Sequence, residues 1–183
     1  QTGGTVTLNK LSSAQANAIS VLNDVTTLAI VLSSATATTD TATVTIDDVD
    51  TTAAAITIGD ITAAGVETLN IVTGDKSTIT HVVSDLDGST SVKTIKVSGA
   101  ANLTITDATD MAAGGTVDAA SFANDLEVAI GAGDTVLGGS GDDTVNIAFG
   151  QLGNTTKVAG STGDDTINVT GNGMDMVDAD FAL

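Results

Sequence analysis

Apolar and polar residues alternate along most of this chain in short segments that are separated by turn-forming residues. Alternation with a period of two places every second side chain on the same face, which is typical of a half-buried β-strand. The connectors are rich in glycine, aspartate, asparagine and alanine, and the chain has no proline. The pattern therefore predicts an all-β fold with strands at residues 44–46, 56–58, 69–71, 79–82, 95–97, 103–105, 126–128, 145–147 and 167–169.

The N-terminal part of the chain follows a different pattern. Ser12 is a favourable helix N-cap, and apolar residues from Ala14 to Leu22, among them Ile19, follow it at a spacing near 3.6. We therefore expect residues 1–40 to form an N-terminal segment or cap that contains a short helix.

Two segments in the middle of the chain repeat each other loosely. Residues 66–71 and 92–97 share the form apolar-x-Thr-apolar-x-apolar, 26 residues apart, and a glycine follows each of them. Strands that cannot bury a face alone favour coils stacked into a β-solenoid, either a parallel β-helix or a β-roll, and we assign residues 41–128 to an irregular solenoid. A β-sandwich is the alternative, because many short strands joined by turns also permit that fold.

A glycine-aspartate repeat marks the C-terminal part. Residues 138–146 (GGSGDDTVN) fit the calcium-binding β-helix repeat G-G-x-G-x-D-x-U-x at each specified position, and residues 160–168 (GSTGDDTIN) lose only one glycine. Weaker copies surround Asp134 and Asp175. Glycines allow bends that expose backbone carbonyls, and aspartate adds a carboxylate, so the ligands are hard oxygens of the kind calcium prefers. Residues 129–183 are therefore predicted to form a calcium-binding β-roll.

A calcium ion in such a roll would lie between neighbouring turns. This placement suggests the carboxylates of Asp134, Asp143, Asp165 and Asp175 as ligands, and it predicts that Asp143→Ala weakens binding more than Asp142→Ala does. The alternative is that the Gly-Asp pairs only mark tight turns. The remaining ligands are expected from the glycine loops, at Gly138, Ser140, Asp142, Gly160, Thr162 and Asp164.

Asp85 and Asp87 are a second candidate for calcium binding. They resemble the start of an EF-hand loop, but Lys96 stands at position 12, where that loop needs a bidentate glutamate, so the segment is not an EF-hand. The alternative is a solvated turn.

The glycine-aspartate repeats resemble those of RTX proteins, which are secreted calcium-binding proteins of bacteria. The resemblance covers residues 129–178, and within it Ser161 and Thr170 replace glycines while residues 148–159 interrupt the nine-residue phase. It implies Ca2+ as the cofactor and export through a one-step type I secretion system that reads a C-terminal signal.

The strands at residues 65–71 and 98–106, taken together with the RTX-like end, resemble the surface-layer (S-layer) proteins of Gram-negative bacteria. Such proteins form a two-dimensional lattice over the outer membrane that calcium holds together. The resemblance implies a structural role at the bacterial cell surface, with self-association bridged by calcium. Because Gln1 is not an initiator methionine, we expect a piece of a longer polypeptide, and any anchoring to a surface glycan would use parts outside it.

Composition narrows the partners. Twenty-three acidic residues against five lysines give a net charge of −18, so the metal-free chain repels itself and divalent cations would relieve that repulsion. The chain has no cysteine and a single histidine, which excludes disulfides and a structural zinc site. The charge and the lack of tyrosine, tryptophan and arginine oppose nucleic-acid binding, and no apolar stretch is long enough for a transmembrane helix.

An enzyme is not expected. The lone histidine, His81, has no placed catalytic partner, and the chain contains neither a nucleophile elbow nor a phosphate-binding loop motif. Two other functions stay open. An RTX adhesin module would share the fold and the metal, and an ice-binding protein would use outward threonines, although the Thr-x-Thr strands at residues 5–7, 43–45 and 104–106 recur at uneven intervals.

Overall fold

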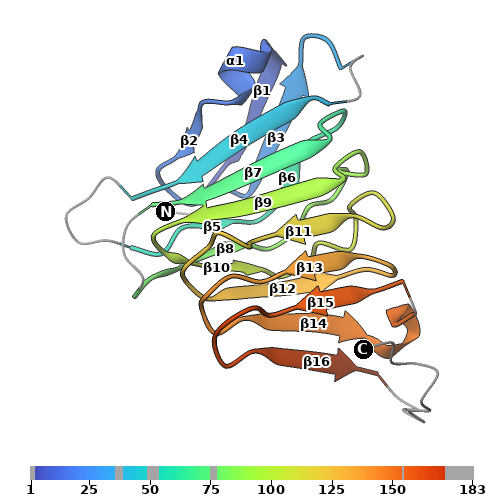
Figure 1. The fold of residues 1–183 in the computed structure, drawn as a ribbon. Helices are drawn as coiled ribbons and strands as arrows, with labels where there is room; N and C mark the ends of the chain where they lie inside the picture. The colour runs from blue at the N-terminus through green and yellow to red at the C-terminus, as the bar shows by residue number, and fades with distance from the viewer. Residues whose placement is uncertain (1–2, 36–38, 49–53, 75–77, 154, 172–183) are drawn as a thin grey trace.

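The chain winds into a β-solenoid of parallel strands in the computed structural model, which describes residues 3–35, 39–48, 54–74, 78–153 and 155–171 (Figure 1). Every strand pair among these residues is parallel. This confirms the predicted β-solenoid over the β-sandwich, whose sheets are antiparallel. The elements are β1 (Thr5–Leu11), α1 (Ser13–Ala16), β2 (Ile19–Val21), β3 (Thr27–Leu32), β4 (Thr41–Ile46), β5 (Thr57–Ile58), β6 (Ile61–Thr62), β7 (Thr68–Thr73), β8 (Thr80–Val83), β9 (Thr94–Gly99), β10 (Asn102–Ile105), β11 (Thr116–Asp118), β12 (Leu126–Ile130), β13 (Thr135–Leu137), β14 (Thr144–Ala148), the 3-10 helix η1 (Phe149–Gln151), β15 (Lys157–Ala159) and β16 (Thr166–Thr170).

Two long sheets form the walls of the solenoid. One is seven-stranded, in the order β15-β13-β11-β9-β7-β4-β2, and the other is six-stranded, in the order β16-β14-β12-β10-β8-β5. A three-stranded sheet, β1-β3-β6, belongs to the N-terminal end. From β7 onward the chain alternates between the two walls, so each coil adds one strand to each wall, and neighbouring coils lie about 4.8 Å apart.

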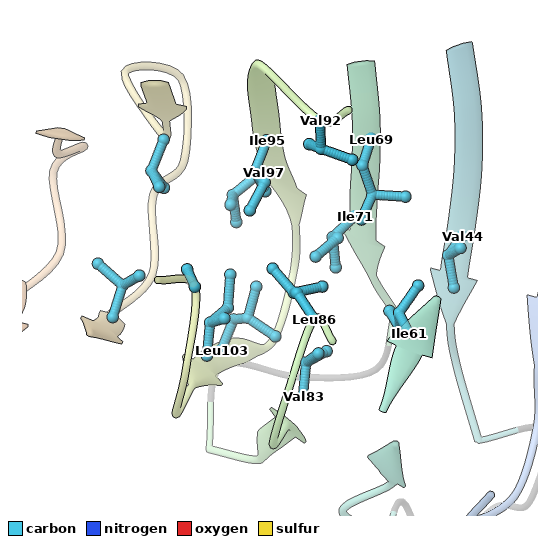
Figure 2. Close-up of a cluster of buried hydrophobic side chains, with 14 of the residues drawn as sticks. Val44, Ile61, Leu69, Ile71, Val83, Leu86, Val92, Ile95, Val97 and Leu103 are labelled. Carbon is cyan, nitrogen blue, oxygen red and sulfur yellow. The ribbon is translucent and has the colours of Figure 1, made fainter. Parts of the chain in front are cut away.

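The hydrophobic core fills the space between the walls (Figure 2). Strand register stacks equivalent residues on successive coils, so that Leu69 pairs with Ile95 and Ile71 with Val97. These pairs are the two copies of the 26-residue repeat, and the register confirms that the repeat marks stacked coils. Each column buries small aliphatic side chains, which suits a chain with only three aromatic residues.

All nine predicted strands coincide with strands of the two walls, namely β4, β5, β7, β8, β9, β10, β12, β14 and β16. Two of the strands that were not predicted, β1 and β3, lie in residues 1–40, which were expected to form a cap with a short helix. Others are too short to show alternation. In β11 only Val117 is buried, and in β13 only Val136. One apolar residue between polar neighbours shows no alternation in the sequence. These strands are recognised only by their pairing with strands of neighbouring coils.

The N-terminal helix is present but shorter than predicted. Ser12 caps α1 through a capping box with Gln15, and the helix ends at Ala16. Ile19 belongs to β2 instead, where it pairs with Val44 and faces the core. Tertiary pairing with the next coil therefore overrode the helical spacing, as it commonly overrides local propensity. The division of the chain into three segments stays a prediction. Its second boundary, between residues 128 and 129, falls within β12 of the six-stranded wall.

Candidate metal centre

The glycine-aspartate turns stand where the chain enters a new strand. Asp134 directly precedes β13 in the seven-stranded wall, whereas Asp143 directly precedes β14 in the six-stranded wall. Nine residues therefore carry the chain from one wall to the other within a coil. The aspartates that stack on adjacent coils are instead Asp143 and Asp165, because Thr144 pairs with Thr166.

The carboxylate of Asp143 points into the coil stack and ties two coils together. Its Oδ1 accepts the N–H of Leu126 in the preceding coil at 2.9 Å, and its Oδ2 accepts the N–H of Gly139 in its own turn at 2.8 Å. Burial raises the pKa of Asp143 above the ordinary aspartate value; the two N–H groups lower it, and the neighbouring charges of Asp165 and Asp125 raise it further. Asp143 is 3% exposed.

Asp134 repeats this arrangement at the other wall. It accepts the N–H of Gly115 in the preceding coil at 2.9 Å and that of Gly131 in its own turn at 2.9 Å. Burial again raises the pKa of Asp134, and the backbone N–H groups lower it. The two inner aspartates therefore do the same structural work, since each closes its own turn and joins that turn to the coil before it.

The first glycine of each repeat makes room for the aspartate five residues later. A Cβ on Gly138 would stand 2.5 Å from Asp143 Oδ2, and a Cβ on Gly160 would overlap the carboxylate of Asp165. This close approach gives the Gly-to-Asp spacing a physical reason, which is the seating of a carboxylate against bare backbone.

A second row of aspartates lies on the outside of the same corner. Asp125, Asp142 and Asp164 are exposed and occupy consecutive coils. The N–H of Asp142 donates to Asp125 Oδ1 at 2.9 Å, and the N–H of Asp164 donates to Asp142 Oδ1 at 2.8 Å. Together with the buried Asp143 and the exposed Asp165 they form the acidic corner, five carboxylates on three consecutive coils.

The donors of the acidic corner suit a hard cation. They are oxygens only, and among the described residues no three acidic or histidine side chains converge closely enough to hold a metal alone. A calcium ion here would also need backbone carbonyls and water, as calcium sites in proteins commonly do. The outer Asp142 and Asp164 fit better than the inner Asp143, because Asp143 already accepts two N–H groups.

The other predicted ligands are placed as follows. Gly138 is buried beside Asp143, Gly160 lies beside Asp165, and Ser140 and Thr162 are exposed. The turns of Ser140 and Thr162 are tied to the preceding coil through their N–H groups, which donate to the carbonyls of Phe122 and Gly139 at 3.0 and 3.2 Å. Asp175 lies outside the described residues.

Asp85 and Asp87 belong to a different corner, where the chain leaves the six-stranded wall. They lie near Asp60, whose Oδ2 accepts the Thr62 hydroxyl at 3.0 Å and whose Oδ1 is buried without a hydrogen bond. Burial raises the pKa of Asp60, the Thr62 hydroxyl lowers it, and the charges of Asp85 and Asp87 raise it. Burial likewise raises the pKa of Asp110, with further contributions from nearby aspartates. The structure thus brings Asp85 and Asp87 together with each other and with Asp60, and not with the Gly-Asp turns.

Two features of the surface could not be read from motif matching. One is Asp125, which has no glycine repeat before it and is found only when coils are aligned by strand register, in which Val128, Val145 and Ile167 stack. The other is a column of threonines on the outer face of the seven-stranded wall, whose spacing in sequence varies because the coils differ in length. Its members are Thr41, Thr68, Thr94, Thr116 and Thr135.

Comparisons of this chain with protein-family models, with curated proteins and with solved structures found no match. Within the described ranges, no helix has both the length and the apolar character that crossing a bilayer requires. The acidic corner is therefore characterised by its own geometry, as a stack of oxygen donors at one edge of the solenoid.

Proposed function

We propose that this chain is a calcium-binding structural protein of the bacterial cell surface, a subunit that self-associates into an S-layer lattice. The observation that carries the proposal is the acidic corner. Five carboxylates on three coils about 4.8 Å apart repel one another, and that repulsion contributes to the raised pKa of Asp143. A divalent cation held between coils would remove this repulsion and stiffen the stack.

The location and the lattice rest on the resemblance of the sequence to RTX and S-layer proteins. A long, narrow solenoid with a net charge of −18 is consistent with that role, because a dense layer of such chains needs cations between them. The site offers no cluster that suits catalysis. The only histidine, His81, is fully buried, and its Nδ1 accepts the N–H of Ile56 at 3.0 Å.

Calorimetric titration of calcium into matched variants tests the metal site. Asp142→Asn should weaken calcium binding at least tenfold, because it removes an outer carboxylate that has an uncommitted oxygen. Asp143→Asn should mainly lower the stability of the fold, since its carboxylate is engaged with backbone. The hydrogen bonds thus favour a larger loss of calcium binding from substitution of Asp142 than of Asp143, whereas the repeat motif alone predicts the reverse. Asp118→Asn, on the other wall, is the control and should bind as the wild type does; no calcium binding by the wild-type chain would refute the proposal.

Electron microscopy before and after addition of calcium tests the assembly. Ordered sheets or filaments that dissolve on chelation support a lattice subunit. Monomers that stay separate with calcium but bind a glycan or a cell surface would support an adhesin module instead.

The threonine column is the one observation that favours ice binding. It repeats on consecutive coils, but the outward position two residues further along each strand holds Thr43, Asn70, Lys96, Asp118 and Leu137, which is not a second threonine rank. A thermal-hysteresis measurement decides the matter, and we expect no activity at high protein concentration.

A further inference from the structure

The two walls of the solenoid carry different charges on their outer faces. The strands of the seven-stranded wall hold two exposed lysines, Lys96 in β9 and Lys157 in β15, and one aspartate, Asp118 in β11. Lys93, just before β9, is also exposed. Four of the chain's five lysines lie in the described residues, and three of these four border this wall; the fourth, Lys10, lies in β1.

The six-stranded wall has the opposite character. Its strands contain no lysine, and Glu127 in β12 is their only acidic residue. The outer aspartates Asp125, Asp142 and Asp164 stand one or two residues before β12, β14 and β16 respectively. This face is therefore acidic over three consecutive coils.

Each face is hollowed where its charge is concentrated. Lys96 borders a hollow of about 330 Å3 on the seven-stranded wall, together with Asn70, Ser98 and Asp118. Glu127 borders a hollow of about 220 Å3 on the six-stranded wall, which Asp125 and Asp142 also line. The hollow on one face thus has Lys96 and Asp118 at its border, and the hollow on the other is lined by three carboxylates.

We propose that the seven-stranded wall of one copy of this chain docks against the six-stranded wall of a second copy, with Lys96 and Lys157 meeting the face formed by Asp125, Glu127, Asp142 and Asp164. One calcium ion in the acidic corner would neutralise two of the charges of the corner and Glu127 and would leave this face negative. The partner is a second copy because the same chain presents both complementary faces. The inference rests on the proposed function, since it names the contact through which that self-association occurs.

The dimensions of the two faces agree. Lys96 and Lys157 lie three coils apart, about 14 Å, and the acidic stretch from Asp125 to Asp164 spans two coils, about 10 Å. A lysine side chain is long enough to reach the next coil, so both lysines can engage the stretch at once when the solenoid axes lie side by side.

The symmetry of this contact suits a layer. The walls are opposite sides of the solenoid, since both bury their inward residues in one shared core. A contact between two different faces is heterologous, so it leaves a free face on each copy and extends into a row instead of closing as a dimer. The contact is also electrostatic and exposed, so it should weaken as ionic strength rises.

Charge reversal tests the contact, with association followed by sedimentation velocity in calcium at low salt. Lys96→Glu and Glu127→Lys should each raise the concentration of half-association at least tenfold. An equal mixture of the two variants should associate again into rows in which they alternate, because each wall of one variant is then complementary to the facing wall of the other. Both substitutions in one chain should restore association to within about threefold of the wild type.

Lys10→Glu is the matched control, because it changes the net charge as Lys96→Glu does but lies on β1 of the three-stranded sheet. It should leave the half-association concentration within twofold of the wild type. Glu127→Gln, which keeps the shape of the side chain, should have an intermediate effect, and circular dichroism should show that each variant is folded.

The outcomes separate this contact from the proposed function. If the wild type assembles with calcium while Lys96→Glu and Lys10→Glu associate equally well, the docking of the two walls is wrong and the lattice proposal stands. If the wild type binds calcium but stays monomeric at every concentration, self-association itself fails, and this contact fails with it.

Discussion

The solenoid has two groups of coils: the upstream coils, which precede the Gly-Asp turns, and the downstream coils, which carry them. The two groups join their turns to neighbouring coils by different chemistry. Upstream, the buried polar side chains that bridge coils are the hydroxyls of Thr73 and Ser89 and the imidazole of His81, whose Nδ1 accepts the N–H of Ile56 at 3.0 Å. Thr73 Oγ1 donates to the carbonyl of Ala101 at 2.7 Å, and Ser89 Oγ accepts the N–H of Ala63 at 3.0 Å. Downstream the bridging residues are the carboxylates of Asp134 and Asp143, which only accept.

The difference shows what the Gly-Asp repeat changes. A hydroxyl can donate and accept, so Ser89 satisfies both a carbonyl, that of Ile61 at 2.8 Å, and an N–H group. A carboxylate satisfies two N–H groups but must be taken out of water with its charge. The hydroxyl bonds of the upstream coils are thus indifferent to pH and cations, whereas the bridging carboxylates of the downstream coils respond to both.

The largest expected effect on stability comes from adding a methyl group at Gly139, where a downstream turn packs against the backbone of the preceding coil. A Cβ on Gly139 would overlap the backbone carbonyl of Phe122, which cannot move aside as a side chain could. Gly139→Ala should therefore lower the free energy of unfolding by about 3 kcal/mol in urea denaturation.

Gly150→Ala is the control for that substitution, because nothing lies within 4 Å of the added methyl group. It should change the free energy of unfolding by less than about 0.5 kcal/mol. Equal stability of the two variants would show that the downstream turns are not packed as described.

A smaller loss is expected when one downstream carboxylate becomes an amide. In Asp143→Asn the NH2 group must face one of the two backbone donors, those of Leu126 and Gly139, so one buried N–H loses its acceptor. We expect a loss of about 2 kcal/mol, measured as the free energy of unfolding by urea with a chelator present. A variant as stable as the wild type would mean that Asp143 does not bridge the coils.

The matched upstream substitution should cost less. Thr73→Val keeps the shape of the side chain but removes the hydroxyl that bonds Ala101, and the expected loss in the free energy of unfolding is about 1 kcal/mol. Because Thr73 is neutral, the loss should be the same at pH 5 and pH 7 and with or without calcium. A loss that varied with calcium would remove the distinction between the two groups of coils.

From residue 41 onward the sequence predicted strands well where two or more apolar residues alternate, because period two is a local property of the chain; β1 and β3 also alternate but were missed. It could not predict partners across coils of unequal length. The offset is 26 residues from Leu69 to Ile95 but 22 from Val145 to Ile167. The prediction therefore grouped Asp134 with Asp143 and Asp165, whereas the structure stacks Asp143 with Asp165 and places Asp134 at the other wall.

The candidate site was predicted in part for a related reason. The motif identified the residues of the Gly-Asp turns, but it did not show which carboxylates turn inward to the backbone and which face outward. That distinction depends on the preceding coil, which supplies the N–H of Leu126 to Asp143. The motif also did not include Asp125, which has no glycine repeat and joins the acidic corner because of the strand register.

The smallest expected effect is a pH dependence to which the downstream carboxylates contribute. Burial raises the pKa values of Asp134 and Asp143, so the folded chain favours their protonated forms more than the unfolded chain does. Such groups stabilise the fold most below the unfolded aspartate value of about 3.9, and this stabilisation is lost as the pH rises through the raised pKa values. The urea midpoint of the metal-free protein should therefore rise as the pH falls from 7 toward that window, and a flat profile would contradict the assignment. Thr73→Val should displace this profile without changing its slope, whereas Asp143→Asn should flatten it, because only the second variant removes a titrating group from the coil stack.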